Sequence, residues 1–84
     1  MATESEIESA IEQIVGYYPA WTIGVTDNPT RRKAEHGNPS VWHDWNANRE
    51  MAARNVEKYF LDKGMKGGGG GGGAVDYVYI FMYS

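Results

Sequence analysis

Seven consecutive glycines, Gly67 to Gly73, constrain the fold of this chain more than any other feature of its sequence. A glycine run has no side chains to bury and loses much conformational freedom on folding, so it resists regular structure. We therefore predict a glycine-rich loop over residues 65–74. This loop has two alternative interpretations. It is either a mobile connector or a loop whose backbone, free of side chains, approaches a ligand or phosphate. No Lys-Ser or Lys-Thr pair follows the glycines, which excludes a P-loop.

The other residues must supply the core, and their composition allows it. The chain has 84 residues, 42% hydrophobic and 13% aromatic, which indicates one globular domain over residues 1–84. It contains no cysteine, which excludes a disulfide framework and makes a cytoplasmic location the default expectation. No apolar run approaches the roughly 18 residues of a membrane span. We therefore expect no membrane partner.

The charges are unevenly distributed along the chain. The net charge of −3 argues against a chain dedicated to nucleic acid. However, residues 1–16 carry four glutamates and no basic residue, whereas residues 17–84 carry all eight Lys and Arg against seven acids. The second part of the chain can therefore still contact phosphates.

The first element predicted is a helix over residues 3–15. Its apolar residues recur with helical period on one face, Thr3 and Glu6 have the spacing of a capping box, and Gly16 is placed to end it. We expect residues 1–16 to form a helix that covers the core and exposes an acidic face. The alternative is that this acidic face binds a partner.

The remaining elements follow from alternation, capping residues and helix breakers. The predicted elements are a strand over 20–26, a short helix that begins at Asp27-Asn28-Pro29 and ends near His36, a loop over 38–46, a helix over 47–63 and a strand over 75–83. The order is therefore helix, strand, helix, helix, strand. The fold class is α+β, with a small antiparallel sheet of two to three strands covered by helices.

The C-terminal strand is apolar on both faces, so we expect it to be central in the sheet or covered on both sides. Two strands alone make a poor sheet. Either Tyr17-Tyr18 begins a further strand, or a homodimer completes the sheet through an exposed edge.

The side chains best suited to binding or catalysis lie around the short helix. Arg32 and His36 are four residues apart and share one helix face. Gly24, at the end of the preceding strand, permits close backbone approach. A guanidinium here could bind a phosphate with two hydrogen bonds, and Arg31 and Lys33 could add to the contact. The alternative is a solvated basic patch.

This stretch resembles the second half of the GIY-YIG endonuclease motif, over roughly residues 20–61. The family has a strand ending in Tyr-Ile-Gly and then a helix with an arginine and often a histidine. In this sequence Gly24 precedes Arg32 by eight residues and His36 by twelve. The resemblance places Glu57 at the family's metal-binding glutamate and implies Mg²⁺ if the domain is active. It also implies metal-dependent cleavage of nucleic acid.

The chain departs from the family pattern in two places. Thr22 stands where the family has its second tyrosine, and the family's first strand is missing upstream. Residues 77–81 resemble that first strand, which would make the chain a circular permutant with Tyr79 as the missing tyrosine. The alternative is that they form the family's third strand.

We expect a domain directed at DNA or RNA, with weak or no metal-dependent cleavage. In this hypothesis Tyr79 or Tyr18 assists the nucleophile, and Trp42 and Trp45 stack on bases. The tryptophans could instead cover a small core. The alternative function is a catalytically inactive domain that binds a protein partner on the same scaffold.

Overall fold

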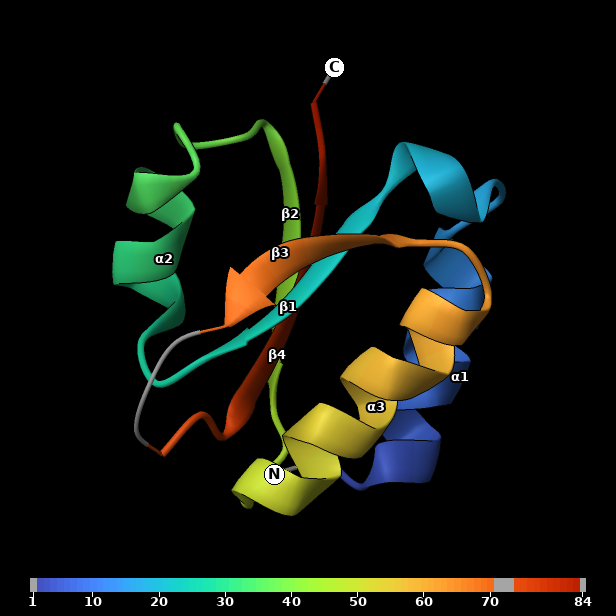
Figure 1. The fold of residues 1–84 in the computed structure, drawn as a ribbon, viewed down its shortest axis with the longest axis vertical. Helices are drawn as coiled ribbons and strands as arrows, with labels where there is room; N and C mark the ends of the chain where they lie inside the picture. Colours follow the sequence, from blue (N-terminus) through green and yellow to red (C-terminus); the bar gives the residue numbers. More distant parts are fainter. Residues whose placement is uncertain (1, 71–73, 84) are drawn as a thin grey trace.

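The computed structural model describes residues 2–70 and 74–83, and Figure 1 shows their arrangement. In chain order the elements are α1 (Glu4–Ile14), the 3-10 turn η1 (Tyr18–Ala20), β1 (Thr22–Thr26), α2 (Pro29–Glu35), β2 (Val41–Asn46), α3 (Glu50–Asp62), β3 (Lys66–Gly70) and β4 (Tyr77–Met82). The predicted helices and the two predicted strands all form, each within a few residues of its expected ends.

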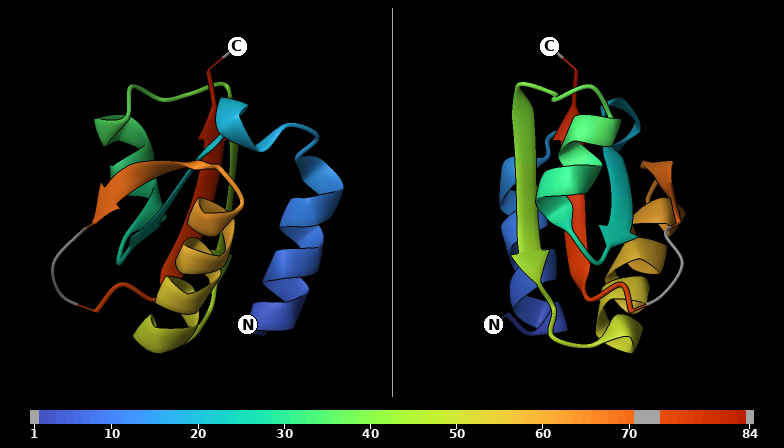
Figure 2. Two further views of the ribbon diagram at one scale, coloured as in Figure 1. Left: turned by 45° about the vertical axis from the view of Figure 1, so that its right-hand side comes forward. Right: turned by 90° about the vertical axis from the view of Figure 1, so that its left-hand side faces the viewer.

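The structure has three layers. Within the described residues, a four-stranded sheet in the order β2-β4-β1-β3 lies between α2 on one face and α1 with α3 on the other (Figure 2). Strand β4 is antiparallel to both β2 and β1, and β3 is parallel to β1. The α+β class and the central position of the C-terminal strand are therefore confirmed, while the sheet has four strands and is mixed.

Strand β2 corrects the prediction of a loop over 38–46. Its polar residues His43, Asp44 and Asn46 hid the strand from sequence reasoning, because they break the apolar alternation on which the prediction relied. The strand forms because all of its residues pair with β4. It lies at one edge of the sheet, where polar side chains can reach solvent.

Strand β3 corrects the prediction of a loop over 65–74, because residues 66–70 form a strand in which Lys66, Gly67 and Gly70 pair with β1. Glycine disfavours a strand through its conformational entropy, but its backbone makes the same ladder hydrogen bonds as any other residue. Pairing with β1 therefore holds a segment with no side-chain pattern. The remainder of the glycine run, 71–73, lies outside the described residues.

Of the two alternatives for completing the sheet, a further strand that begins at Tyr17-Tyr18 is wrong, since Tyr18 begins the 3-10 turn η1. Strands β2 and β3 complete the sheet within one chain. A homodimer is therefore not needed to complete the sheet.

The local signals that set the helix ends act as predicted. Thr3 and Glu6 form a reciprocal capping box at α1, with N···O distances of 3.1 and 2.8 Å. Asn28 caps α2 by accepting a hydrogen bond from the Arg31 amide at 3.1 Å. Gly64 follows α3 with a φ of +113°, a conformation that favours glycine.

The main core lies between the sheet and the α1–α3 layer. It consists of fully buried apolar side chains from these elements, among them Ile7, Ile11, Ile23, Val25, Val56, Phe60, Val78 and Ile80. The opposite face of the sheet buries Tyr79, Phe81 and Thr26 beneath α2. Within the described ranges, no helix is long and apolar enough to cross a membrane.

Candidate functional site

The candidate site is on the α2 face of the sheet, and it is built around the buried Tyr79. This residue lies directly opposite Gly24 in the β1–β4 register. A Cβ atom at Gly24 would collide with the phenol ring, and one at Gly68 on β3 would lie 2.5 Å from the phenol oxygen. The Tyr79 side chain therefore lies across the bare backbones of β1 and β3, which explains why both positions are glycine.

Two side chains from α2 meet the Tyr79 hydroxyl. Arg32 donates from Nε to this oxygen at 3.3 Å, and His36 Nε2 lies 2.9 Å from it. The hydroxyl also lies 3.3 Å from the carbonyl oxygen of Gly68. It has one hydrogen to donate, so it donates either to this carbonyl or to a neutral His36. The predicted pair Arg32 and His36 is thus joined to Tyr79.

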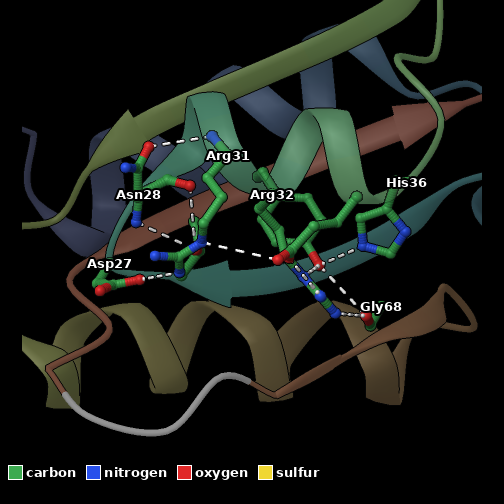
Figure 3. A network of polar contacts seen from close by, with 9 residues as sticks. Asp27, Asn28, Arg31, Arg32, His36 and Gly68 are labelled. Atoms are coloured by element: carbon green, nitrogen blue, oxygen red, sulfur yellow. Dashed lines mark hydrogen bonds and ion pairs between the residues drawn. The ribbon is translucent and has the colours of Figure 1, made fainter.

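The Gly68 carbonyl is the fourth member of this cluster and accepts from Arg32 Nη2 at 2.7 Å (Figure 3). It can do so because the β1–β3 register shifts: Ile23 pairs with Gly67, but Val25 pairs with Gly70. One extra residue on β3 forms a bulge. Bulges redirect groups out of the ladder near functional sites, and this one explains how the Gly68 carbonyl can face Arg32.

Arg32 is held in place but keeps some capacity to bind a ligand. Its Nη1 donates to Glu35 at 3.0 Å, so three of the five guanidinium N–H groups bond to described residues. The side chain is 24% exposed. A ligand can therefore reach a guanidinium whose orientation is already fixed. Arg31, by contrast, pairs with Asp27 at 2.6 Å on the outer side of α2 and is 54% exposed.

The protonation states follow from burial. Burial raises the pKa of Tyr79; Arg32 opposes this rise, and the charges of Glu57 and Glu35 add to it. Burial, followed by the charge of Arg32, lowers the pKa of His36 below its ordinary value. At neutral pH Tyr79 is therefore protonated and His36 is neutral, so His36 can accept a proton.

Glu57 lies on α3, and its charge adds to the raised pKa of Tyr79. The residue is partly buried, and burial raises the pKa of its carboxyl group while Arg54 opposes the rise. Among the residues that the structure describes, no three His, Cys, Asp or Glu side chains gather to hold a metal ion. A single carboxylate holds Mg²⁺ only together with phosphate oxygens and waters, so Glu57 would need a bound nucleic acid to complete such a site.

The two candidate tryptophans are on opposite faces of β2. Trp42 stacks on Tyr79, with ring centroids 4.7 Å apart and planes 7° apart, so it belongs to the site. Trp45 packs against the main core on the other face. Tyr18 also lies away from the cluster, with its ring 5.9 Å from that of the core residue Phe60. Lys33 is on α2 with the other basic residues.

Sequence reasoning missed two members of the site. Asp44 lies opposite Tyr79 in the β2–β4 register and accepts a hydrogen bond from Trp42 Nε1 at 2.7 Å. If residues 41–46 had been predicted as a strand, alternation would have placed Asp44 on the same face as Trp42. Gly68 acts through its backbone carbonyl, for which the sequence carries no signal.

Together these contacts define an α+β domain with an Arg–His–Tyr cluster over a mixed sheet. Comparison with protein-family models, curated proteins and solved structures gives no match for this chain.

Proposed function

We propose that this domain binds the phosphodiester backbone of nucleic acid through Arg32 and His36, with weak or no metal-dependent cleavage. The observation that carries the proposal is the convergence of these two side chains on the Tyr79 hydroxyl. A guanidinium that is already oriented, with two N–H groups that bond to no described residue, suits bidentate phosphate recognition.

The strand pairing supports a circularly permuted relationship to the GIY-YIG family. In that relationship β4 would be the family's first strand and β1 its hairpin partner, and the two pair antiparallel with Tyr79 opposite Gly24. Reading from β4, the order is then β4, β1, α2, β2 and α3. Strand β2 would take the place of the third strand, and Glu57 would lie on the helix that follows it.

Each residue has a role in this proposal. Arg32 binds the phosphate, and a neutral His36 that donates its Nε2 hydrogen to Tyr79 can accept a proton from an attacking water at Nδ1. Tyr79 has 0% exposure, so its hydroxyl positions Arg32 and His36 and does not itself meet the nucleophile. Glu57 would hold Mg²⁺, which when bound polarises the phosphate and stabilises the leaving oxygen.

Binding and cleavage are tested on a mixed pool of single-stranded, duplex and branched DNA with Mg²⁺. We expect Arg32→Gln to weaken binding, while Arg54→Gln, which removes an exposed arginine from an α3 ion pair, does not. If the wild type cleaves, Glu57→Gln should abolish cleavage and Glu50→Gln should not. No binding by the wild type would overturn the proposal.

The alternative is a domain that binds a protein partner, and one observation favours it. Glu4, Glu8 and Glu12 form a line of carboxylates along α1, and burial together with the charges of its two neighbours raises the pKa of Glu8. This acidic face is on the layer opposite the Arg32 cluster. A partner captured by the wild type but not by Glu8→Gln would support this alternative.

A further inference from the structure

Strand β3 brings a second cation to the face of the sheet that carries Arg32. Lys66 is the first residue of β3, and it is fixed there by the hydrogen bond from its amide to the Trp21 carbonyl at 3.0 Å. It is also the register partner of Thr22 on β1. The charged residue that opens the glycine strand therefore has a defined place in the sheet.

The face on which Lys66 lies follows from its two neighbours. A Cβ atom at Gly67 would point to the α3 side and contact Leu61 at 3.6 Å, whereas one at Gly68 would point to Tyr79 on the opposite side. Successive residues of a strand point to opposite faces. The Lys66 side chain therefore starts on the same face as the Gly68 position, which is the face of the site.

Lys66 is close to Arg32 along the strand and is accessible. It precedes Gly68, the residue that binds the Arg32 guanidinium, by two residues, which is about 6.6 Å along a strand. Lys66 is exposed, and within the described part of the chain it takes part in no ion pair. An ammonium group on a flexible stem can therefore bind an anion beside Arg32.

We propose that Lys66 is a second phosphate-binding residue, and that the ligand is a nucleic-acid strand with at least two consecutive phosphates. One phosphate lies on Arg32 and the next on Lys66, at the β3 edge of the site. This inference rests on the proposed function, because it requires Arg32 to bind phosphate. It also gives a role to β3, whose glycines leave the path between the two cations free of side chains.

The test uses a fluorescein-labelled ten-nucleotide oligo-dT and measures its dissociation constant by anisotropy at several salt concentrations. Each phosphate contact on single-stranded DNA contributes about −0.7 to the slope of log K against log[salt]. We expect Lys66→Gln to weaken binding and to make the slope less negative by about 0.7. Lys58→Gln, which removes an exposed lysine from α3, should change neither quantity.

Thymidine 5′-monophosphate, used as a competitor, separates one phosphate from two. It should displace the oligonucleotide from the wild type only weakly, and its own affinity should be nearly the same for Lys66→Gln. If Lys66→Gln binds the oligonucleotide as Lys58→Gln does while Arg32→Gln loses binding, the role of Lys66 is refuted and the proposed function stands. If the wild type does not bind the oligonucleotide, both fall.

Discussion

The substitution Gly68→Ala tests whether the glycine strand is a structural part of the site. The added Cβ atom would lie 2.5 Å from the Tyr79 oxygen and 3.3 Å from the Ile23 carbonyl oxygen. Neither neighbour can move easily, since Tyr79 is fully buried and Ile23 pairs with both β3 and β4. The strand or the phenol must therefore shift.

Two costs follow from that shift. Overpacking a well-packed site costs about 1–3 kcal/mol. Displacing the Gly68 carbonyl weakens its hydrogen bond to the Arg32 guanidinium, and hydrogen bonds to charged groups contribute about 1.5–3 kcal/mol. Because partial relaxation relieves both, we expect Gly68→Ala to lower the free energy of unfolding by about 2–4 kcal/mol. For a domain of this size, that corresponds to a fall in Tm of at least about 8 °C.

Gly67→Ala is the matched control one residue away. Its Cβ atom would lie 3.6 Å from Leu61, an ordinary contact. We therefore expect a change within about 0.5 kcal/mol. Both variants are measured by urea denaturation, followed by circular dichroism. Equal stability of the two variants would refute the account of Tyr79 lying against Gly68.

Three further predictions concern the core and the cluster. Ile11→Ala should lower the free energy of unfolding by about 2–5 kcal/mol, because Ile11 is fully buried. In the same urea titration Ile14→Ala should lower it clearly less, because Ile14 is 36% exposed. Equal, small losses for the two variants would mean that α1 does not cover the core. Tyr79→Phe removes the hydroxyl that meets Arg32 and His36, so it should lower the free energy of unfolding by about 1–3 kcal/mol. Tyr77→Phe should leave this free energy nearly unchanged. Calorimetry in which Tyr77→Phe is the less stable variant would contradict the contacts of the Tyr79 hydroxyl. The pKa of His36 is lowered in the folded state, so the unfolded state takes up a proton on this residue first as the pH falls below about 6.5. The wild type should therefore lose stability relative to His36→Gln between pH 7.5 and 5.5. A constant difference in stability between the two proteins would contradict the burial of His36.

The sequence predicted those parts of the fold that carry a side-chain pattern. Apolar periodicity and the Thr3–Glu6 capping box placed α1, and the doubly apolar residues 75–83 placed β4 at the centre of the sheet. The spacing of four residues placed Arg32 and His36 on one helix face. Only the resemblance to a family suggested that Tyr79 belongs with them.

The parts that escaped prediction carry no such pattern. Strand β3 consists of Lys66 followed by glycines, so only its pairing with β1 defines it. Strand β2 forms at the sheet edge by pairing with β4. Its polar residues interrupt the apolar alternation that would otherwise have predicted a strand with Trp42 and Trp45 on opposite faces. The Gly68 carbonyl reaches Arg32 because the β1–β3 register shifts, and this shift depends on tertiary pairing that no local sequence pattern specifies.

The most direct test of the account is an NMR titration of the ¹⁵N-labelled chain with the ten-nucleotide oligo-dT. The Arg32 Nε–Hε resonance reports on the guanidinium itself, and the backbone amides report on every layer of the fold. We predict the largest shifts at Arg32 Nε–Hε and at the amides of His36 and Lys66, with little change along α1. Shifts confined to α1 and α3, with the Arg32 resonance unmoved, would contradict a phosphate site on this face of the sheet.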